Sequence, residues 1–84
     1  MLYKIDIEKK AAKSLEKINE PDYSRIKTAI INLAKDPRPM GYRKLKGRPA
    51  FRITIGNYRI IYEIIDNKLL ITIIAIGHRK DIYR

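Results

Sequence analysis

Residues 51–65 read FRITIGNYRIIYEII, and this stretch decides the fold that we expect. In residues 51–55 apolar and polar side chains alternate, which is the pattern of a strand with one buried face. Residues 58–65 form a second β-prone run. Only Gly56-Asn57 separates the two runs, so we expect a tight turn between them. The stretch therefore predicts a hairpin of two antiparallel strands.

Two further strands are predicted on either side of this hairpin in the sequence. Residues 69–76 are almost wholly apolar, which is typical of a central strand covered on both faces or nearly so. We expect this strand to end at Gly77. Residues 3–7 alternate and predict a short N-terminal strand that completes the sheet.

Two amphipathic segments predict helices over residues 8–18 and 21–35. Asp36-Pro37 ends the second helix, because the residue before a proline avoids the helical region. The two helices form an antiparallel hairpin that must cover one face of the sheet, since nothing else is available to do so. We therefore predict an α+β fold, a compact β-α-α-β-β-β arrangement with a mostly antiparallel sheet.

The chain has 84 residues, with no cysteine and one histidine. This length predicts a single domain over residues 1–84, too small to hold a nucleotide-cofactor domain. Without cysteine there is no thiolate metal site or thiol nucleophile, and we expect neither a metal nor a cofactor. The N-terminal residues contain no long apolar run, so we expect no signal peptide and no membrane span, and a cytoplasmic location.

Positive charge is concentrated in the second half of the chain. The formal net charge is +10. Residues 1–37 carry eight cations and six acids, whereas residues 38–84 carry eleven cations and three acids. Residues 37–50, which we expect to be a loop with a short extended piece at 42–46, contain five cations and no acid. Such a balance indicates a polyanion or an acidic protein as partner.

The predicted hairpin brings cations together on the sheet face away from the helices. Arg52 and Thr54 share one face of the first strand, and Arg59 lies on the adjacent strand. Like charges side by side across a sheet repel, and an anion that binds between them relieves the repulsion. The tail at residues 78–84 adds basic side chains and Tyr83. Guanidinium groups bind phosphate and tyrosine stacks on bases, so this combination indicates nucleic-acid binding.

Four segments resemble RelE-type toxins of the RelE/ParE superfamily: KLKG at residues 44–47, FRI at 51–53, YRIIYE at 58–63 and IGHRKDIY at 76–83. The ending GHRKDIYR is similar to the RelE branch rather than the ParE branch, which poisons DNA gyrase. The resemblance implies the toxin of a type II toxin-antitoxin system. It also implies a ribosome-dependent, metal-independent mRNA endonuclease, which inhibits translation through attack of a ribose 2′-OH on the adjacent phosphate.

The same resemblance implies roles for individual residues. Arg59 matches a phosphate-stabilising arginine, Arg79 an arginine that assists the leaving group, and Tyr83 a tyrosine that stacks on or orients the base. His78 is our candidate proton acceptor, because it alone has an ordinary pKa near neutrality. Thr54 stands where the family has a lysine and cannot act as a base. The expected substrate-binding residues are Arg52, Thr54, Lys44, Lys46, Lys80 and Arg84.

The implied partners are the ribosome with its mRNA and a RelB-like antitoxin that is acidic and partly disordered. Operator DNA is expected to bind only through the antitoxin, and no membrane is involved. Two alternatives remain: a ParE-like, non-enzymatic inhibitor of DNA gyrase, and a small basic RNA-binding protein. The combination of Arg59, Arg79 and Tyr83 favours the endonuclease.

Overall fold

The predicted hairpin is present in the computed structural model, which describes residues 2–80. β3 (Phe51–Ile55) pairs antiparallel with β4 (Tyr58–Ile65), and both strands have the predicted bounds. Gly56 at the turn has a φ of +60°, in the region that glycine adopts without steric cost. A glycine with positive φ at the first turn position is the requirement of a type II′ turn, whose twist matches that of the flanking strands.

The described strands form one five-stranded sheet in the order β1-β5-β4-β3-β2. β5 (Leu70–His78) lies antiparallel to β4, and β1 (Lys4–Ile7) lies parallel to β5 at the edge. β2 (Arg43–Lys44) is a two-residue strand at the other edge, inside the predicted extended piece. A short 3₁₀ helix, η1 (Asp66–Lys68), connects β4 to β5. The mostly antiparallel α+β prediction is confirmed.

β5 does not end at Gly77, as the sequence had suggested. Gly77 pairs with Arg59 and His78 pairs with Tyr58, so the strand continues to the level of the β3–β4 turn. Here β4 continues to pair with β5 at Gly77 and beyond, so the glycine does not end the strand. The predicted end of the strand, Ile76, was therefore two residues too early.

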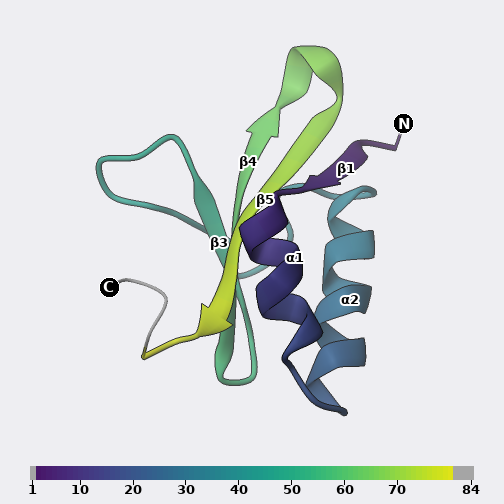
Figure 1. The fold of residues 1–84 in the computed structure, drawn as a ribbon. Coiled ribbons are helices and arrows are strands. Elements are labelled where there is room, and N and C mark those ends of the chain that lie inside the picture. The colour runs from purple at the N-terminus through teal and green to yellow at the C-terminus, as the bar shows by residue number, and fades with distance from the viewer. Residues whose placement is uncertain (1, 81–84) are drawn as a thin grey trace.

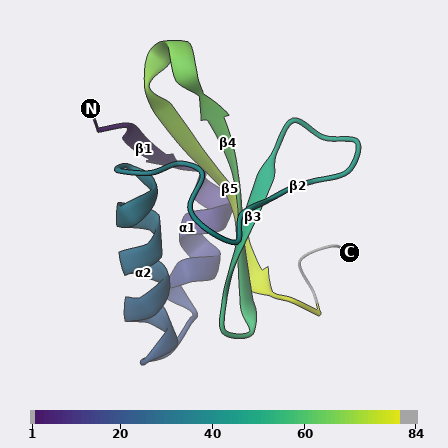
Figure 2. The same cartoon turned by 180° about the vertical axis from the view of Figure 1, so that it is seen from behind.

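Both helices pack on one face of the sheet (Figures 1 and 2). They are α1 (Lys9–Glu16) and α2 (Asp22–Leu33), each shorter than predicted. In the described part of the chain no helix is long and apolar enough to cross a membrane. The core consists of apolar side chains from α1, α2 and the facing strands. Its main members are Ala11, Leu15, Ile26, Ile30, Leu33, Ile53, Ile60, Tyr62, Ile71, Ile73 and Ile76.

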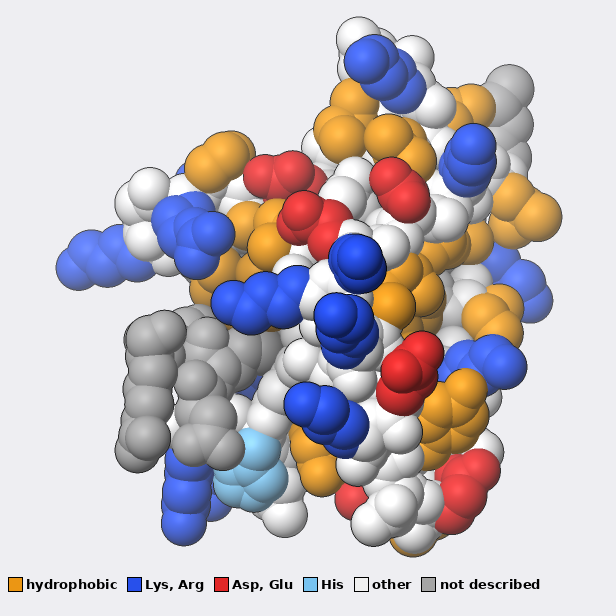
Figure 3. Space-filling model, viewed as in Figure 1, with side chains coloured by type: hydrophobic (Ala, Val, Ile, Leu, Met, Phe, Trp, Pro, Cys, Tyr) orange, Lys and Arg blue, Asp and Glu red, His pale blue; other side chains and the backbone are white. Residues whose placement is uncertain are grey.

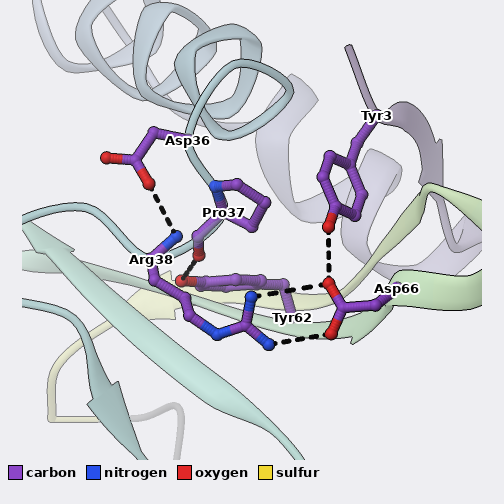
Figure 4. A network of polar contacts seen from close by, with 6 residues as sticks. All are labelled: Tyr3, Asp36, Pro37, Arg38, Tyr62 and Asp66. Atoms are coloured by element: carbon purple, nitrogen blue, oxygen red, sulfur yellow. Dashed lines mark hydrogen bonds and ion pairs between the residues drawn. The ribbon is translucent and has the colours of Figure 1, made fainter. Parts of the chain in front are cut away.

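A polar network joins three chain segments at one end of the sheet (Figure 4). The Asp66 carboxylate accepts hydrogen bonds from the Tyr3 hydroxyl and from the Arg38 guanidinium, whose Nη2 lies 2.9 Å away. The Tyr62 hydroxyl donates to the backbone oxygen of Pro37 at 2.7 Å, and burial raises the pKa of Tyr62 to about 12. The network thus connects the N-terminal residues, the segment after α2 and η1.

Replacement of a core isoleucine should cost far more stability than replacement of an exposed one. Ile73 in β5 is fully buried, whereas Ile31 on α2 is 53% exposed. We expect Ile73→Ala to lower the free energy of unfolding by about 2–5 kcal/mol, since it leaves a cavity. Ile31→Ala should stay within about 0.5 kcal/mol of wild type. Urea denaturation of both variants checks this, and equal losses would contradict the packing described here.

The Asp66 network should make stability depend on pH at the acid end. Hydrogen bonds from Arg38 and then Tyr3 lower the pKa of Asp66 below its unfolded value. A carboxylate whose pKa is lower in the folded state than in the unfolded state stabilises the fold at pH values above its unfolded-state pKa. This stabilisation is lost as the pH falls through the folded-state pKa, which for Asp66 lies below about pH 4. Asp66→Asn should therefore be less stable than wild type at pH 7, and the difference should shrink at pH 3. A difference that is the same at both pH values would rule out this coupling.

Candidate nucleic-acid interface

The side chains of Arg52, Thr54 and Arg59 lie on the sheet face away from the helices. In β3 and β4 they alternate with Ile53 and Ile60, which point into the core. Thr54 is directly paired with Arg59, and residues that face each other across two strands share one side of the sheet. The hairpin thus separates its apolar and cationic side chains onto opposite faces.

The two arginines converge on one hydroxyl. Arg52 Nη1 donates to Thr54 Oγ1 at 3.3 Å, and Arg59 Nη1 donates to the same oxygen at 3.1 Å. Both arginines are partly buried, whereas Thr54 is exposed. Two guanidinium charges are therefore held together within reach of solvent. This arrangement suits a phosphate, because guanidinium groups bind its oxygens through charge-assisted hydrogen bonds.

Arg43 belongs to the same face and was missed by the sequence analysis. In β2 it pairs with Arg52, whereas its neighbour Lys44 pairs with Phe51 on the helix side of the sheet. The predicted substrate contact at Lys44 is thus on the other face from Arg52 and Arg59. Only the register between β2 and β3 reveals this, because an irregular loop separates the two strands. Lys46 lies in that loop and is exposed, and Figure 3 shows Lys and Arg side chains where the loop projects from the molecule.

His78 lies apart from the two arginines. It pairs with Tyr58, and the two rings meet edge to face with their centroids 5.8 Å apart. The backbone N–H of Lys80 donates to His78 Nδ1 at 3.3 Å. Tyr58 and Arg59 are consecutive in β4 and therefore point to opposite faces. The histidine proposed from the sequence as proton acceptor is thus on the face opposite Arg59, because β5 continues beyond Gly77.

The segment after β5 begins beside the β3–β4 turn. The backbone N–H of Arg79 donates to the Asn57 carbonyl at 2.8 Å, and the side chains of Arg79 and Lys80 are exposed. Tyr83 and Arg84, two further predicted site residues, lie outside the described residues. Within residues 2–80 no three His, Asp or Glu side chains gather in a way that could hold a metal ion.

A family model described as "ParE toxin of type II toxin-antitoxin system, parDE" matches residues 5–83. The chain therefore belongs to this family of toxins. It is 26% identical over 83 residues to the mRNA interferase toxin RelE of Escherichia coli (strain K12), across 95% of this chain and 86% of that protein.

Two solved structures of archaeal complexes are also similar. The RelE–RelB complex from Pyrococcus horikoshii OT3 contains a chain with a TM-score of 0.84 and 26% identity, and the match covers 96% of this chain and 99% of that one. The RelB–RelE antitoxin–toxin complex from Methanococcus jannaschii contains a chain with a TM-score of 0.73 and 28% identity. That match covers 93% of this chain and 94% of the other. The predicted resemblance to the RelE/ParE superfamily is confirmed.

Arg43 and Lys44 offer a matched test of which sheet face binds RNA. They are adjacent cations whose side chains point to opposite faces. We expect Arg43→Ala to weaken binding of a single-stranded RNA oligonucleotide and to reduce the salt slope by about 0.7, the loss of one phosphate contact. Lys44→Ala should change the slope less. Fluorescence anisotropy across a salt series measures both, and a larger effect of Lys44→Ala would place the RNA on the helix side.

Proposed function

We propose that this protein is the toxin of a type II toxin-antitoxin pair and acts as an mRNA interferase. In this proposal it is a ribosome-dependent, metal-independent endoribonuclease that inhibits translation in the cytoplasm. The observation that carries the proposal is the convergence of Arg52 and Arg59 on Thr54, on a sheet face that the helices leave open. The similarity to RelE of Escherichia coli, named an mRNA interferase, supports it.

The proposed reaction is an internal transfer at phosphorus. The ribose 2′-oxygen bonds to the adjacent phosphorus, the bond to the 5′-oxygen breaks, and a 2′,3′-cyclic phosphate and a 5′-hydroxyl result. Water takes the proton that leaves the 2′-oxygen, and the 5′-oxygen takes up a proton from water. The phosphorane between these states carries more negative charge than the phosphodiester. Arg52 and Arg59 would stabilise that charge with donors that the sheet already holds in place.

The described residues of this site supply charge stabilisation but no base. Guanidinium groups stay protonated at neutral pH, and His78 is on the other face. In the proposal the ribosome therefore positions the mRNA so that the 2′-oxygen aligns with the phosphorus, and such alignment can lower a reaction barrier by about 7–11 kcal/mol. Arg79 assists the leaving group and Tyr83 orients the base, as the resemblance implies.

The proposed partner in the cell is an acidic, partly disordered, RelB-like antitoxin. The two archaeal relatives were solved as complexes with RelB. In this chain the basic segment of residues 38–50 offers an acidic partner the sheet edge at β2 and four exposed cations, Arg43, Lys44, Lys46 and Arg48. An extended acidic segment could add to such an edge, and its charges would neutralise the surface. Operator DNA would bind through the antitoxin.

A second candidate function is inhibition of DNA gyrase without cleavage, because the matching family model is described as a ParE toxin. Primer extension on a translated mRNA, with and without induced protein, separates the two. New 5′ ends inside codons support the endonuclease. Intact mRNA together with arrested DNA replication would support the gyrase inhibitor and overturn our proposal.

Arg59 should be the residue on which cleavage depends most. In single-turnover cleavage on programmed ribosomes, we expect Arg59→Ala to lower the rate about 10²–10³-fold, the usual effect of losing a donor to a developing oxyanion. Arg59→Lys should restore only part of it, since a point charge does not replace a planar fork. Arg25→Ala is the matched control, because Arg25 is an exposed arginine on α2 that faces Asp22. A wild-type rate for Arg59→Ala at saturation would show that Arg59 does not stabilise the phosphate.

A further inference from the structure

β3 extends beyond β2, so part of its outer edge has no partner strand. β2 pairs only with the first two residues of β3. If that pairing continued in the same register, Gly41 would lie opposite Thr54. The chain is instead in a turn there, because the Tyr42 N–H donates to the Pro39 carbonyl at 3.0 Å and Gly41 has a φ of +91°. In the described part of the chain, no backbone hydrogen bond reaches Thr54 from this side.

The backbone N–H and C=O of Thr54 point to this open edge. In an antiparallel pair, hydrogen-bonded and non-hydrogen-bonded positions alternate. Ile55 and Tyr58 flank the two-residue turn and form a hydrogen-bonded pair, so Thr54 and Arg59 form the non-hydrogen-bonded pair that follows. Thr54 thus offers one backbone donor and one backbone acceptor to a further strand.

An apolar groove of about 360 Å³ lies beside this edge, between α2 and β3. The segment that crosses from α2 to β2 passes one end of it (Figure 2). Met40 in that segment is fully exposed, which is unusual for a large apolar side chain. The apolar residues that line the groove are Ala29, Leu33, Pro39, Met40, Ile53 and Ile55.

We propose that the open edge of β3 and this groove form a docking site for an extended segment of an antitoxin. That such an acidic antitoxin exists rests on the proposed function. The segment residue opposite Thr54 exchanges two backbone hydrogen bonds with it, and its side chain lies on the open face of the sheet. The residues on either side point to the helix face, where the groove takes apolar side chains. The site therefore selects a segment with apolar residues at alternate positions.

Charge selects an acidic residue opposite Thr54. Arg43 and Arg52 are paired at the preceding position of the edge, on the same face as the Thr54 side chain. Arg52 Nη1 lies 3.3 Å from Thr54 Oγ1, so an acidic side chain added there would lie beside that guanidinium, and opposite charges at neighbouring positions stabilise strand pairing. A second copy of this chain fits less well, because two chains of formal net charge +10 repel each other.

This docking site differs from the sheet edge at β2, because it lies in line with β2 rather than outside it. The exposed cations of residues 38–50 attract the antitoxin, whereas the groove holds it by apolar burial, which salt does not screen. A segment bound there also sets its acidic residue beside Arg52, on the face where the proposed function places RNA. Docking would therefore compete with RNA.

The peptide acetyl-Glu-Leu-Asp-Leu-Glu-amide is a probe with this alternation. Titrated into the full-length protein, it should cause saturable NMR shifts of the backbone amides of Ile53–Ile55 and Ala29, and it should displace a single-stranded RNA oligonucleotide. N-methylation of the aspartate removes its hydrogen bond to the Thr54 carbonyl and should weaken binding about tenfold. N-methylation of a leucine is the matched control, since its N–H points away from β3.

Two tryptophan variants on α2 test the groove. Asn32 lines the groove, whereas its neighbour Ile31 is 53% exposed and does not. Both side chains are exposed, so the urea midpoints should stay close to wild type. Asn32→Trp should fill the groove and weaken peptide binding at least about tenfold, the effect of excluding one buried leucine. Ile31→Trp should bind as wild type does.

The outcomes separate this site from the proposed function. If wild type cuts no mRNA but binds the peptide as described, the proposed endonuclease is wrong and the docking site stands. If wild type does not bind the peptide, if Asn32→Trp binds it as tightly as wild type, or if the two N-methylated peptides bind equally, the docking site is wrong. If sedimentation shows that wild type alone forms a dimer that Asn32→Trp disrupts, the occupant is a second copy and the proposal is also wrong.

Discussion

The pairing register of the β3–β4 hairpin is the constraint on which the rest of this structure depends. Side chains in a strand alternate between faces, so a slip by one residue would move every side chain of that strand to the other side. The turn at Gly56 fixes the register, and the burial of Ile53 and Ile60 against the helices holds it. Once those isoleucines point inward, Arg52 and Arg59 have to point outward.

Because of this register, the two faces of the sheet carry different kinds of side chain. The helix side carries the apolar contacts that stabilise the fold, with Tyr62 fully buried at its centre. The open side carries the partly buried Arg52 and Arg59 beside the buried Ile61. A small domain of this kind has only one core, and here that core lies between the helices and the sheet, so the arginines of β3 and β4 lie on the face that no helix covers. Variants on the two faces should accordingly affect different properties, stability on one and anion binding on the other.

The polar network around Asp66 limits which cations of the basic segment are accessible to a binding partner. Arg38 opens the basic segment of residues 38–50, but its guanidinium is hydrogen-bonded to Asp66. That contact raises the pKa of Arg38 and fixes the start of the segment to η1. Arg38 therefore acts in the structure of the toxin, whereas Arg43, Lys44, Lys46 and Arg48 are exposed and remain accessible.

The sequence by itself determined the fold and the core of the site, because both follow from local periodicity. Alternation in residues 51–55 and the two-residue turn predicted that Arg52 and Arg59 meet on the open face, and the structure confirms that geometry. Tertiary structure alone decided that Arg43 rather than Lys44 joins them and that His78 does not. Both outcomes depend on pairings across irregular segments, between β2 and β3 and at the extended end of β5. Local periodicity fixes the alternation within a strand, but the partner strand decides which set of side chains faces the core.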